Sequence, residues 1–387
     1  MRTLYARTSE IDDPARAVAE ILDQPNAGPG LLKNSLGIVS CYAEFIDTGV
    51  IAALAEALPF PIVGITTIAA AANGEIGELQ LFLTVLTGDD VEFLIGHTEP
   101  LAGEEMEPFR KAWAETGAKR PDKPVMMLSF APLLLSYTMD FYADVWTSII
   151  GDVPNFGSLA VDHNQDYRDS QTIYNGQAFK DRYVFILMYG NLQPQFLVGS
   201  IRKEDVFREK GVVTASRGNL LKAVNGVSVG DYLTGLGLSR DEQGNILGIN
   251  TYPLIVDFND GSEPVVRALF AVTPDGSAVC GGRMPLGASL TVGTFDGQAV
   301  LDTTADVLAL AAEIARAKER ILLIYSCIGR YFALGYNPLA EMEKTREILG
   351  DIPWSLAYSG GELCPVYGMD GTLTNRIHND TMVICLL

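Results

Sequence analysis

The sequence predicts an α/β protein with mixed sheets and two domains, built from repeated strand-helix-strand-strand units with inserted antiparallel hairpins. First, an apolar strand, a helical stretch, a proline-led strand and a third strand follow one another three times along the 387 residues. Second, the opening strand of each copy is almost continuously apolar, which is typical of a strand covered on both faces. Third, four Asn-Gly or Asp-Gly pairs separate short alternating segments between the second and third copies, and such pairs favour tight hairpins.

The first predicted element is a helix over 14–22. Asp13 precedes it, and Asp is a preferred N-cap residue because its side chain accepts hydrogen bonds from free N–H groups of the first turn. Pro14 suits the first helical position, where the missing backbone N–H is not needed. This helix comes before the first copy of the repeat.

Each copy of the repeat begins with an apolar strand, and the three are expected at 37–41, 125–129 and 321–327. A helical stretch follows, at 50–58, 139–150 and 339–349. The proline-led strands are expected at 61–67, 154–160 and 353–359, and the third strands at 79–86, 183–188 and 381–387. A strand-helix-strand crossover places two strands parallel, so the third strand can return antiparallel and make each sheet mixed.

The region between the second and third copies, about 200–317, has a different pattern. Its turn signals are Asn225-Gly226, Asp260-Gly261, Asp275-Gly276 and Asp296-Gly297. They separate alternating segments, such as 252–258 and 267–272, which we expect to pair as antiparallel hairpins. A helix is predicted at 304–318. A boundary near 200–202 gives an N-terminal domain over 1–200 with two copies, and a C-terminal domain over 201–387 with the hairpins and the third copy.

Charge and composition exclude several classes of partner. The chain has 28 Lys and Arg against 48 Asp and Glu, a formal charge of −20, so it can hardly assemble a basic face for nucleic acid or an anionic membrane. No secretory signal is recognised, and the longest nearly apolar run, 60–72, is too short to span a membrane. The five cysteines favour buried reduced thiols over a disulfide framework. We therefore expect a cytoplasmic protein.

The densest group of polar residues lies at the strand ends of the third copy. Arg330 follows the first strand, Glu362 follows the second, and His378 with Asn379 precedes the third. Ligands bind outside the carboxyl ends of parallel strands, so we expect these side chains to face one cavity. An Arg binds a carboxylate and a Glu attracts an ammonium, which suits an amino acid. The alternative is structural: an ion pair between Arg330 and Glu362, with His378 and Asn379 capping the last strand.

Other chemistry is also open at these positions. Cys327 could be a nucleophile with His378 as its base and Glu362 or Asp380 orienting that base, or simply a packed thiol at the end of an apolar strand. The Asp-His-Asn-Gln-Asp segment 162–166 could bind a metal, or could be a solvated loop. Three His residues are too few for a multi-His metal centre but allow one axial haem ligand. We assign no catalytic residue and no metal.

With these motifs in view, the chain resembles the FIST family of bacterial sensory proteins over about 36–387. The segments that carry the resemblance are 213–214, 218–219, 225–226, 326–330, 358–362 and 378–381. In these terms an N-terminal FIST half runs to about Gly199 and a C-terminal half follows. The first half departs from the family pattern, because Gly-Ile-Thr-Thr at 64–67 and four alanines at 69–72 stand where Gly-Cys-Ser-Thr and small residues are usual. A site is therefore not expected in the first half.

The resemblance implies a sensory module of bacterial signal transduction that binds a small polar ligand such as an amino acid. The ligand-binding residues that we carry over or place beside the site are Arg330, Tyr358, Glu362, His378, Asn379 and Cys327. No kinase, cyclase or methyl-accepting segment is recognised, so the expected output partner is a separate signalling protein, such as a kinase or chemoreceptor.

Two alternatives remain beside the amino-acid sensor. Some similar proteins are described as binding haem, which gives a haem-based gas sensor, for nitric oxide, with His378 as the axial ligand. The other is a cysteine-dependent hydrolase or transferase that uses Cys327 and His378. Apart from haem, no cofactor is expected.

Overall fold

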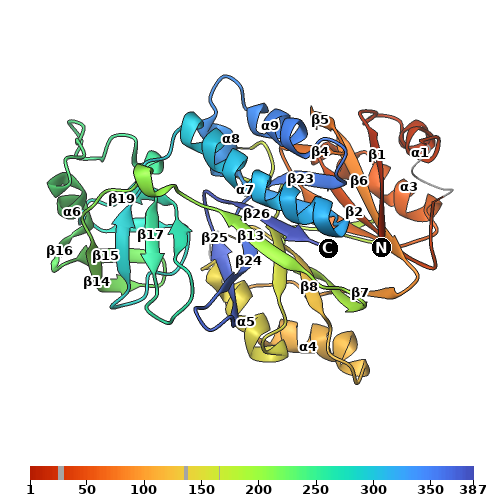
Figure 1. Cartoon of the computed structure of the whole chain (residues 1–387), viewed down its shortest axis with the longest axis horizontal. Coiled ribbons are helices and arrows are strands. Elements are labelled where there is room, and N and C mark those ends of the chain that lie inside the picture. Colours follow the sequence, from red (N-terminus) through yellow and green to blue (C-terminus); the bar gives the residue numbers. More distant parts are fainter. Residues whose placement is uncertain (25–29, 135–137, 165) are drawn as a thin grey trace.

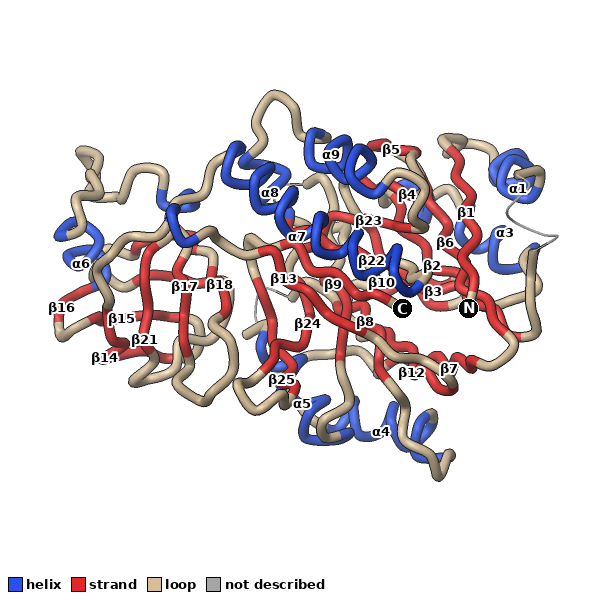
Figure 2. The backbone as a smooth tube through the Cα atoms, in the orientation of Figure 1, coloured by secondary structure: helices blue, strands red, loops and turns tan. Residues whose placement is uncertain are grey.

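The computed structural model describes residues 1–24, 30–134, 138–164 and 166–387, which form three mixed sheets around a common core and a separate antiparallel unit at one end (Figure 1). The strands lie inside and the main helices lie outside them (Figure 2). The predicted α/β class with mixed sheets is confirmed. Within the described residues, no helix has both the length and the apolar character needed to cross a membrane.

The three repeat copies each supply the middle of one six-stranded sheet. The first sheet has the order β1 (Arg2–Thr8), β6 (Leu81–Gly88), β2 (Asn34–Cys41), β3 (Ile62–Thr66), β10 (Thr172–Tyr174) and β11 (Gln177–Phe179). The second has the order β7 (Val91–His97), β12 (Val184–Gly190), β8 (Met126–Ala131), β9 (Asn155–Leu159), β24 (Glu362–Tyr367) and β25 (Leu373–His378). The third has the order β13 (Gln195–Gly199), β26 (Met382–Leu386), β22 (Leu322–Cys327), β23 (Trp354–Ser359), β4 (Ala69–Ala72) and β5 (Glu75–Glu78).

Strand direction confirms the predicted repeat. In every copy the opening strand pairs parallel with the second strand, as β2 does with β3, β8 with β9 and β22 with β23. The third strand of each copy runs antiparallel to the opening strand. The predicted bounds differ from the observed ones by up to three residues, because apolar runs locate a buried strand better than its ends.

A cyclic exchange of hairpins joins the three sheets, and the sequence did not predict it. The hairpin β4–β5 of the first copy pairs with β23 of the third. The hairpin β10–β11 of the second copy pairs with β3 of the first, and β24–β25 of the third pairs with β9 of the second. Each sheet is thus completed by another copy, and we call the three joined sheets with their helices the ring.

The helices cover the outer faces of the ring (Figure 1). Those of the first copy are α1 (Pro14–Leu22), α2 (Glu44–Asp47) and α3 (Val50–Ala57), and those of the second are α4 (Glu107–Glu115) and α5 (Asp140–Ile150). Those of the third are α7 (Gly297–Lys318), α8 (Ile328–Ala333) and α9 (Ala340–Leu349). The predicted first helix has the predicted bounds, and its Asp13 side chain accepts hydrogen bonds from two first-turn N–H groups.

Helix α7 begins earlier than the predicted 304–318, and this corrects one turn signal. Asp296-Gly297 is not a hairpin turn; Asp296 is the N-cap of α7, and its side chain accepts a hydrogen bond from the N–H of Ala299 at 2.9 Å. Asp favours both turns and N-caps for the same reason, since its short carboxylate binds nearby backbone N–H groups.

The core of the ring lies where the inner faces of the three sheets meet. One buried apolar cluster draws on all three sheets. The rings of Phe156 from the second copy and Tyr325 from the third lie 5.4 Å apart between centroids. Separate clusters lie between each sheet and its own helices. All five cysteines are buried and unpaired, as the sequence predicts.

The antiparallel unit, residues 203–295, stands at one end of the ring, and we call it the inserted unit. Its strands are β14 (Gly211–Arg217), β15 (Leu220–Val224), β16 (Val227–Ser228), β17 (Leu254–Asp257), β18 (Val265–Arg267), β19 (Leu269–Val272), β20 (Ala278–Cys280) and β21 (Ser289–Val292), with one helix, α6 (Val229–Gly235). Turns lie at the predicted 225–226, 260–261 and 275–276. The division at residue 200 stays a prediction, and the pair β13–β26 crosses it.

Candidate functional site

The second strands of the three copies converge at one place in the ring. The N–H of Val161, just after β9, donates to the carbonyl of Thr66 in β3 at 3.1 Å. The hydroxyl of Thr67 donates to the carbonyl of Tyr358 in β23 at 2.9 Å. A backbone bond of 3.0 Å joins β9 to the turn after β23. The carboxyl ends of the parallel strands therefore meet, which is where α/β sheets place ligands.

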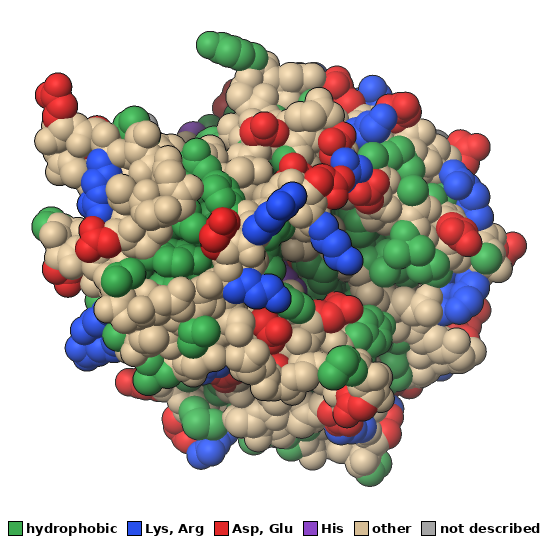
Figure 3. Space-filling view, turned by 60° about the vertical axis from the view of Figure 1, so that its left-hand side comes forward, with side chains coloured by type: hydrophobic (Ala, Val, Ile, Leu, Met, Phe, Trp, Pro, Cys, Tyr) green, Lys and Arg blue, Asp and Glu red, His purple; other side chains and the backbone are tan. Residues whose placement is uncertain are grey.

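A pocket of about 330 Å³ lies beside this junction, between the ring and the inserted unit, and we call it the interlobe pocket. Its apolar wall includes Leu133, Met139, Phe270, Phe295, Ile328 and Phe332. Its polar wall includes Cys327, Asn379 and Asp380. On the face of Figure 3, which brings this end of the molecule forward, hydrophobic side chains gather in hollows, and acidic and basic side chains are interspersed around them.

Asp380 lies between β25 and β26 and is 4% exposed. Its backbone has a left-handed φ of 54°, which turns the chain sharply after β25. Its Oδ1 packs against Gly329, where a Cβ would lie 2.3 Å away, so a larger residue at 329 would push the Asp380 carboxyl out of this position. Its Oδ2 accepts no hydrogen bond from the described residues. Burial raises the pKa of Asp380 to about 7, and the charge of Arg330 opposes that shift.

Glu362 begins β24 and is fully buried near Asp380. Its Oε2 accepts a hydrogen bond from the Thr381 hydroxyl at 3.0 Å, while Oε1 has no partner among the described residues. Burial raises the pKa of Glu362 well above its usual value, and the charge of Asp380 adds to the shift. Two carboxyl groups near one another in a buried site disfavour the state in which both are ionised.

Asn379 links the polar wall to the inserted unit. Its Oδ1 accepts a hydrogen bond from the N–H of Ala268 at 3.4 Å, and a Cβ at Gly281 would lie 2.3 Å from the same oxygen. Nearby, Arg267 of the inserted unit forms a buried ion pair with Asp140 of α5, with 2.6 Å between Nη2 and Oδ1. The interlobe pocket is therefore closed on one side by polar contacts between the two bodies.

The structure gives Arg330 a different partner from the predicted Glu362. Arg330 is fully buried on α8, and its Nη2 lies 2.7 Å from Oε1 of Glu341 on α9. The guanidinium also donates to the hydroxyls of Thr303 and Thr304 on α7. Arg330 does not line the interlobe pocket, so it ties three helices together.

His378 and Tyr358 are buried beside the pocket without lining it. His378 Nε2 lies 3.0 Å from the carbonyl of Cys364, and burial lowers the pKa of the imidazole to about 3. The Tyr358 hydroxyl donates to the carbonyl of Pro338 at 3.2 Å, and burial raises its pKa.

Cys327 lines the pocket, and the nearest acceptor of its thiol is Asp380 Oδ1 at 4.0 Å. Burial and the neighbouring carboxylates raise its pKa. Of the six predicted site residues, the structure therefore brings Cys327 and Asn379 to the pocket wall, Glu362 beside it, and Arg330, Tyr358 and His378 into other contacts.

The described residues of segment 162–166 form a loop, and their contacts are those of a turn. Asp162 accepts backbone N–H bonds from Asn164 and Asp169, and residue 165 lies outside the described residues. The described part of the chain contains no group of three or more His, Cys, Asp or Glu side chains placed to bind one metal ion.

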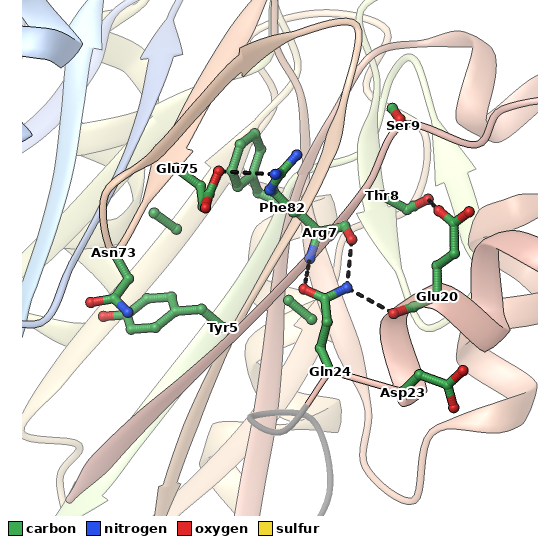
Figure 4. A pocket seen from close by; sticks show the side chains of 12 residues that line it. Tyr5, Arg7, Thr8, Ser9, Glu20, Asp23, Gln24, Asn73, Glu75 and Phe82 are labelled. Carbon is green, nitrogen blue, oxygen red and sulfur yellow. Dashed lines mark hydrogen bonds and ion pairs between the residues drawn. The ribbon is translucent and has the colours of Figure 1, made fainter.

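A larger, more open hollow of about 670 Å³ lies along the edge strand β1 (Figure 4). Several of its polar groups are bound to one another, whereas the buried hydroxyl of Tyr5 has no hydrogen-bond partner among the described residues. The Gln24 amide bonds both the N–H and the carbonyl of Arg7, and the Arg7 guanidinium pairs with Glu75 at 2.9 Å. The Gln24 side chain thus occupies the free edge of β1 at Arg7.

Fold and pocket together describe a two-body α/β protein with a buried carboxyl on the wall between its bodies. The chain belongs to the FIST family: the FIST N domain matches residues 35–227 and the FIST C domain matches 230–365. FIST domains are associated with sensing and signal transduction.

Other comparisons add little. No curated protein matches the chain. A crystal structure of a cyanuric acid hydrolase from A. caulinodans is 10% identical, covers 100% of this chain and 98% of its own, and has a TM-score of 0.39. At that level of similarity nothing about activity follows.

Asp380 lines the pocket but is not among the ligand-binding residues expected from the sequence. From the sequence its one expected role is to orient His378 as a base. Its place after a hairpin strand, in a left-handed turn against Gly329, depends on the pairing of β24 with β25. That pairing was not predicted.

Proposed function

We propose that this chain is a cytoplasmic sensory protein of signal transduction that binds a small molecule bearing an amino group in the interlobe pocket. The single observation that carries the proposal is a buried carboxyl, Asp380, on the wall of a pocket between two bodies. Its Oδ2 has no hydrogen-bond partner among the described residues, and a buried carboxyl oxygen in that state is costly unless a ligand or water satisfies it. An amino acid, expected from the family resemblance, is one molecule of this class.

Ligand binding between two bodies provides a way to signal. The inserted unit contributes Phe270 and Phe295 to the pocket, and the ring contributes Asp380 and α8. A ligand that contacts both bodies favours the arrangement in which they lie together, and so shifts the population that a partner recognises. We propose a separate kinase or chemoreceptor as that partner.

Thermal-shift screening of the full chain with amino acids and amines tests the proposal. At 100 times its dissociation constant, a ligand specific for the folded state adds about 2.7 kcal/mol of stability. The variant Ala333→Phe fills the pocket from α8 and should abolish the shift, while Leu310→Phe, at an exposed position of α7, should keep it. No shift from any compound, or equal shifts in the Ala333→Phe variant, would reject the pocket.

The haem alternative finds no support at His378. An axial ligand needs an accessible imidazole nitrogen. His378 is 1% exposed, its Nε2 faces the Cys364 carbonyl, and it does not line the pocket. The residues around His378 therefore do not fit a haem.

The cysteine-enzyme alternative finds no support either. A nucleophilic cysteine needs a lowered pKa and a base within reach. Burial and two carboxylates raise the pKa of Cys327, and the His378 ring is directed to the Cys364 carbonyl.

A further inference from the structure

We propose that the ligand of the interlobe pocket is an organic amine with an apolar body and no carboxylate, bound through Asp380. This inference rests on the proposed function, because it narrows the class of molecule that the same pocket takes. It differs from the amino-acid expectation in one chemical group, so the two can be separated by matched compounds.

The apolar residues and the volume of the pocket indicate which ligand body fits it. Phe270 and Phe295 of the inserted unit, Ile328 and Phe332 of α8, and Leu133 of the second copy all line the cavity. Phe270 is 53% exposed and Phe332 is 60% exposed, so a ligand can cover apolar surface that water now contacts. A cavity of about 330 Å³ is at the small end of ligand sites, which are roughly 300–1,000 Å³. A single aromatic ring with a short chain suits it.

The charged side chains that line the pocket indicate which polar group of the ligand binds there. Among the described residues that line the pocket, Asp380 is the one with a carboxylate, and none is Lys, Arg or His. The positions outside the described residues, 25–29, 135–137 and 165, also contain no Lys, Arg or His. The pocket wall therefore offers a partner for a cation and no side-chain cation for an anion.

The nearest guanidinium groups are engaged elsewhere. Arg330 is bound to Glu341 with 0% exposure, and Arg267 is bound to Asp140 with 0% exposure. A carboxylate on the ligand would lose its hydration next to Asp380 and Glu362 without an opposite charge to compensate, which is strongly unfavourable. An amine meets no such penalty, so the pocket discriminates against the zwitterion.

The carboxyl group of Asp380 can accept a further hydrogen bond. Its Oδ2 and the Oε1 of Glu362 have no hydrogen-bond partner among the described residues. The thiol of Cys327, at 4.0 Å from Oδ1, is a weak donor at long range. Charge-assisted hydrogen bonds from an ammonium are about twice as strong as neutral ones, so an amine satisfies this site better than an alcohol of the same shape.

The test compares three matched probes on the full chain: 2-phenylethylamine, L-phenylalanine and 2-phenylethanol, extended to a panel of primary amines with their amino-acid and alcohol counterparts. Binding is measured by calorimetry and by thermal shift. We expect an amine to bind at least tenfold more tightly than its counterparts. Asp380→Asn should weaken amine binding at least tenfold and leave alcohol binding within twofold, because Asn tolerates the left-handed conformation and keeps the shape of the side chain.

Asp351→Asn is the matched control. Asp351 is exposed, lies between α9 and β23 and does not line the pocket, so this variant should bind amines like the parent. Amino acids that bind as tightly as amines, or an Asp380→Asn variant with full amine affinity, overturn the inference and leave the proposed sensor standing. A panel in which only alcohols bind also overturns it. Absence of binding by every amine, amino acid and alcohol overturns the inference and the proposed function together.

Discussion

Asp380 combines burial, a left-handed backbone and a carboxyl oxygen, Oδ2, that has no hydrogen-bond partner among the described residues. The groups that face it are Glu362 from β24, Cys327 from the end of β22 and Arg330 from α8. Burial disfavours its ionised form, raising its pKa, and the charge of Arg330 favours the ionised form. The charge of this carboxyl therefore changes near neutral pH, where a ligand can decide its state.

Amine binding should strengthen as pH rises from 6 to 8. The pKa of Asp380 is raised to about 7, so the carboxylate that an ammonium needs is about one-tenth populated at pH 6 and about nine-tenths at pH 8. An alkyl ammonium stays charged over this range. Calorimetry should show affinity rising about tenfold, with a flat profile for Asp380→Asn. A profile that falls with pH would contradict this assignment.

The same group makes the unliganded protein less stable as pH rises. In the unfolded chain an Asp titrates near 3.9, while the folded pKa is about 7, so the folded state holds the extra proton between those values. The free energy of unfolding should therefore fall as pH rises from about 4 to about 7, by up to about 4 kcal/mol for this group. Urea unfolding at pH 5 and pH 8 checks it, with Asp380→Asn losing less stability than the parent.

Arg330 is predicted to matter for stability rather than for the ligand. Arg330→Met leaves Glu341 buried without its cation, which costs about 3–5 kcal/mol. The double variant with Glu341→Met should recover part of that loss. Urea unfolding measures both, and Lys344→Met, from an exposed pair, should cost under about 1 kcal/mol. A stable Arg330→Met variant that fails to bind amines would contradict this prediction and would show that Arg330 takes part in ligand binding.

At the scale of the elements, two glycines allow the parallel strands to approach. A Cβ at Gly64 would lie 1.9 Å from the carbonyl oxygen of Val39, and one at Gly157 would lie 1.9 Å from that of Ser129. Both glycines stand three residues after the proline that begins the second strand, and Leu356 occupies that place in the third copy. The three copies share a strand order, and the third has a side chain at the position where the other two require glycine.

Gly157→Ala should destabilise the protein by at least about 1–3 kcal/mol, because the added methyl meets backbone that cannot move aside cheaply. Gly235→Ala, on α6 with nothing within 4 Å of the new Cβ, should be neutral or stabilise by about 0.4–1 kcal/mol. Thermal and urea unfolding of the two variants provide the comparison. Equal effects would mean that the β8–β9 pair is looser than described.

The sequence predicts the elements better than their partners. Apolar runs and prolines locate the repeat strands because burial and backbone geometry act locally. The pairing of β4–β5 with β23 joins residues far apart in the chain, and no local pattern specifies it. For the same reason the sequence places Arg330 with Glu362, in one cavity or in an ion pair, and not with Glu341. Glu341 lies on a predicted helix, but which face of that helix meets Arg330 depends on the packing of α7, α8 and α9.

At the scale of the whole molecule, the ring couples the two family halves. Strand pairs that join residues of the FIST N match, 35–227, with residues after 230 occur at β13–β26, β4–β23 and β9–β24. The core cluster is also shared among all three sheets. The halves therefore depend on each other for sheet edges and for a buried surface.

Fragments 1–200 and 201–387 should fail to fold separately and should co-purify as one complex when expressed together. Each fragment alone exposes unpaired strands and apolar surface from the shared core, which favours aggregation. Size-exclusion chromatography and near-ultraviolet circular dichroism measure the outcome. A monomeric fragment with a cooperative unfolding transition would show that one half is an independent domain.

The exchanged hairpins also constrain how relatives of this chain can diverge. A change in residues 69–78 alters the edge of a sheet at which the neighbouring strand, β23, is encoded some 280 positions later, at 354–359. If each copy had kept its own hairpin, the sequences of the copies could diverge independently. Because each hairpin here pairs with a strand of another copy, the sequences at these borders are constrained together. Substitutions in Ala70 and Ala357, which face each other across that border, should appear as correlated pairs among homologous genes, and so should those across the two equivalent borders.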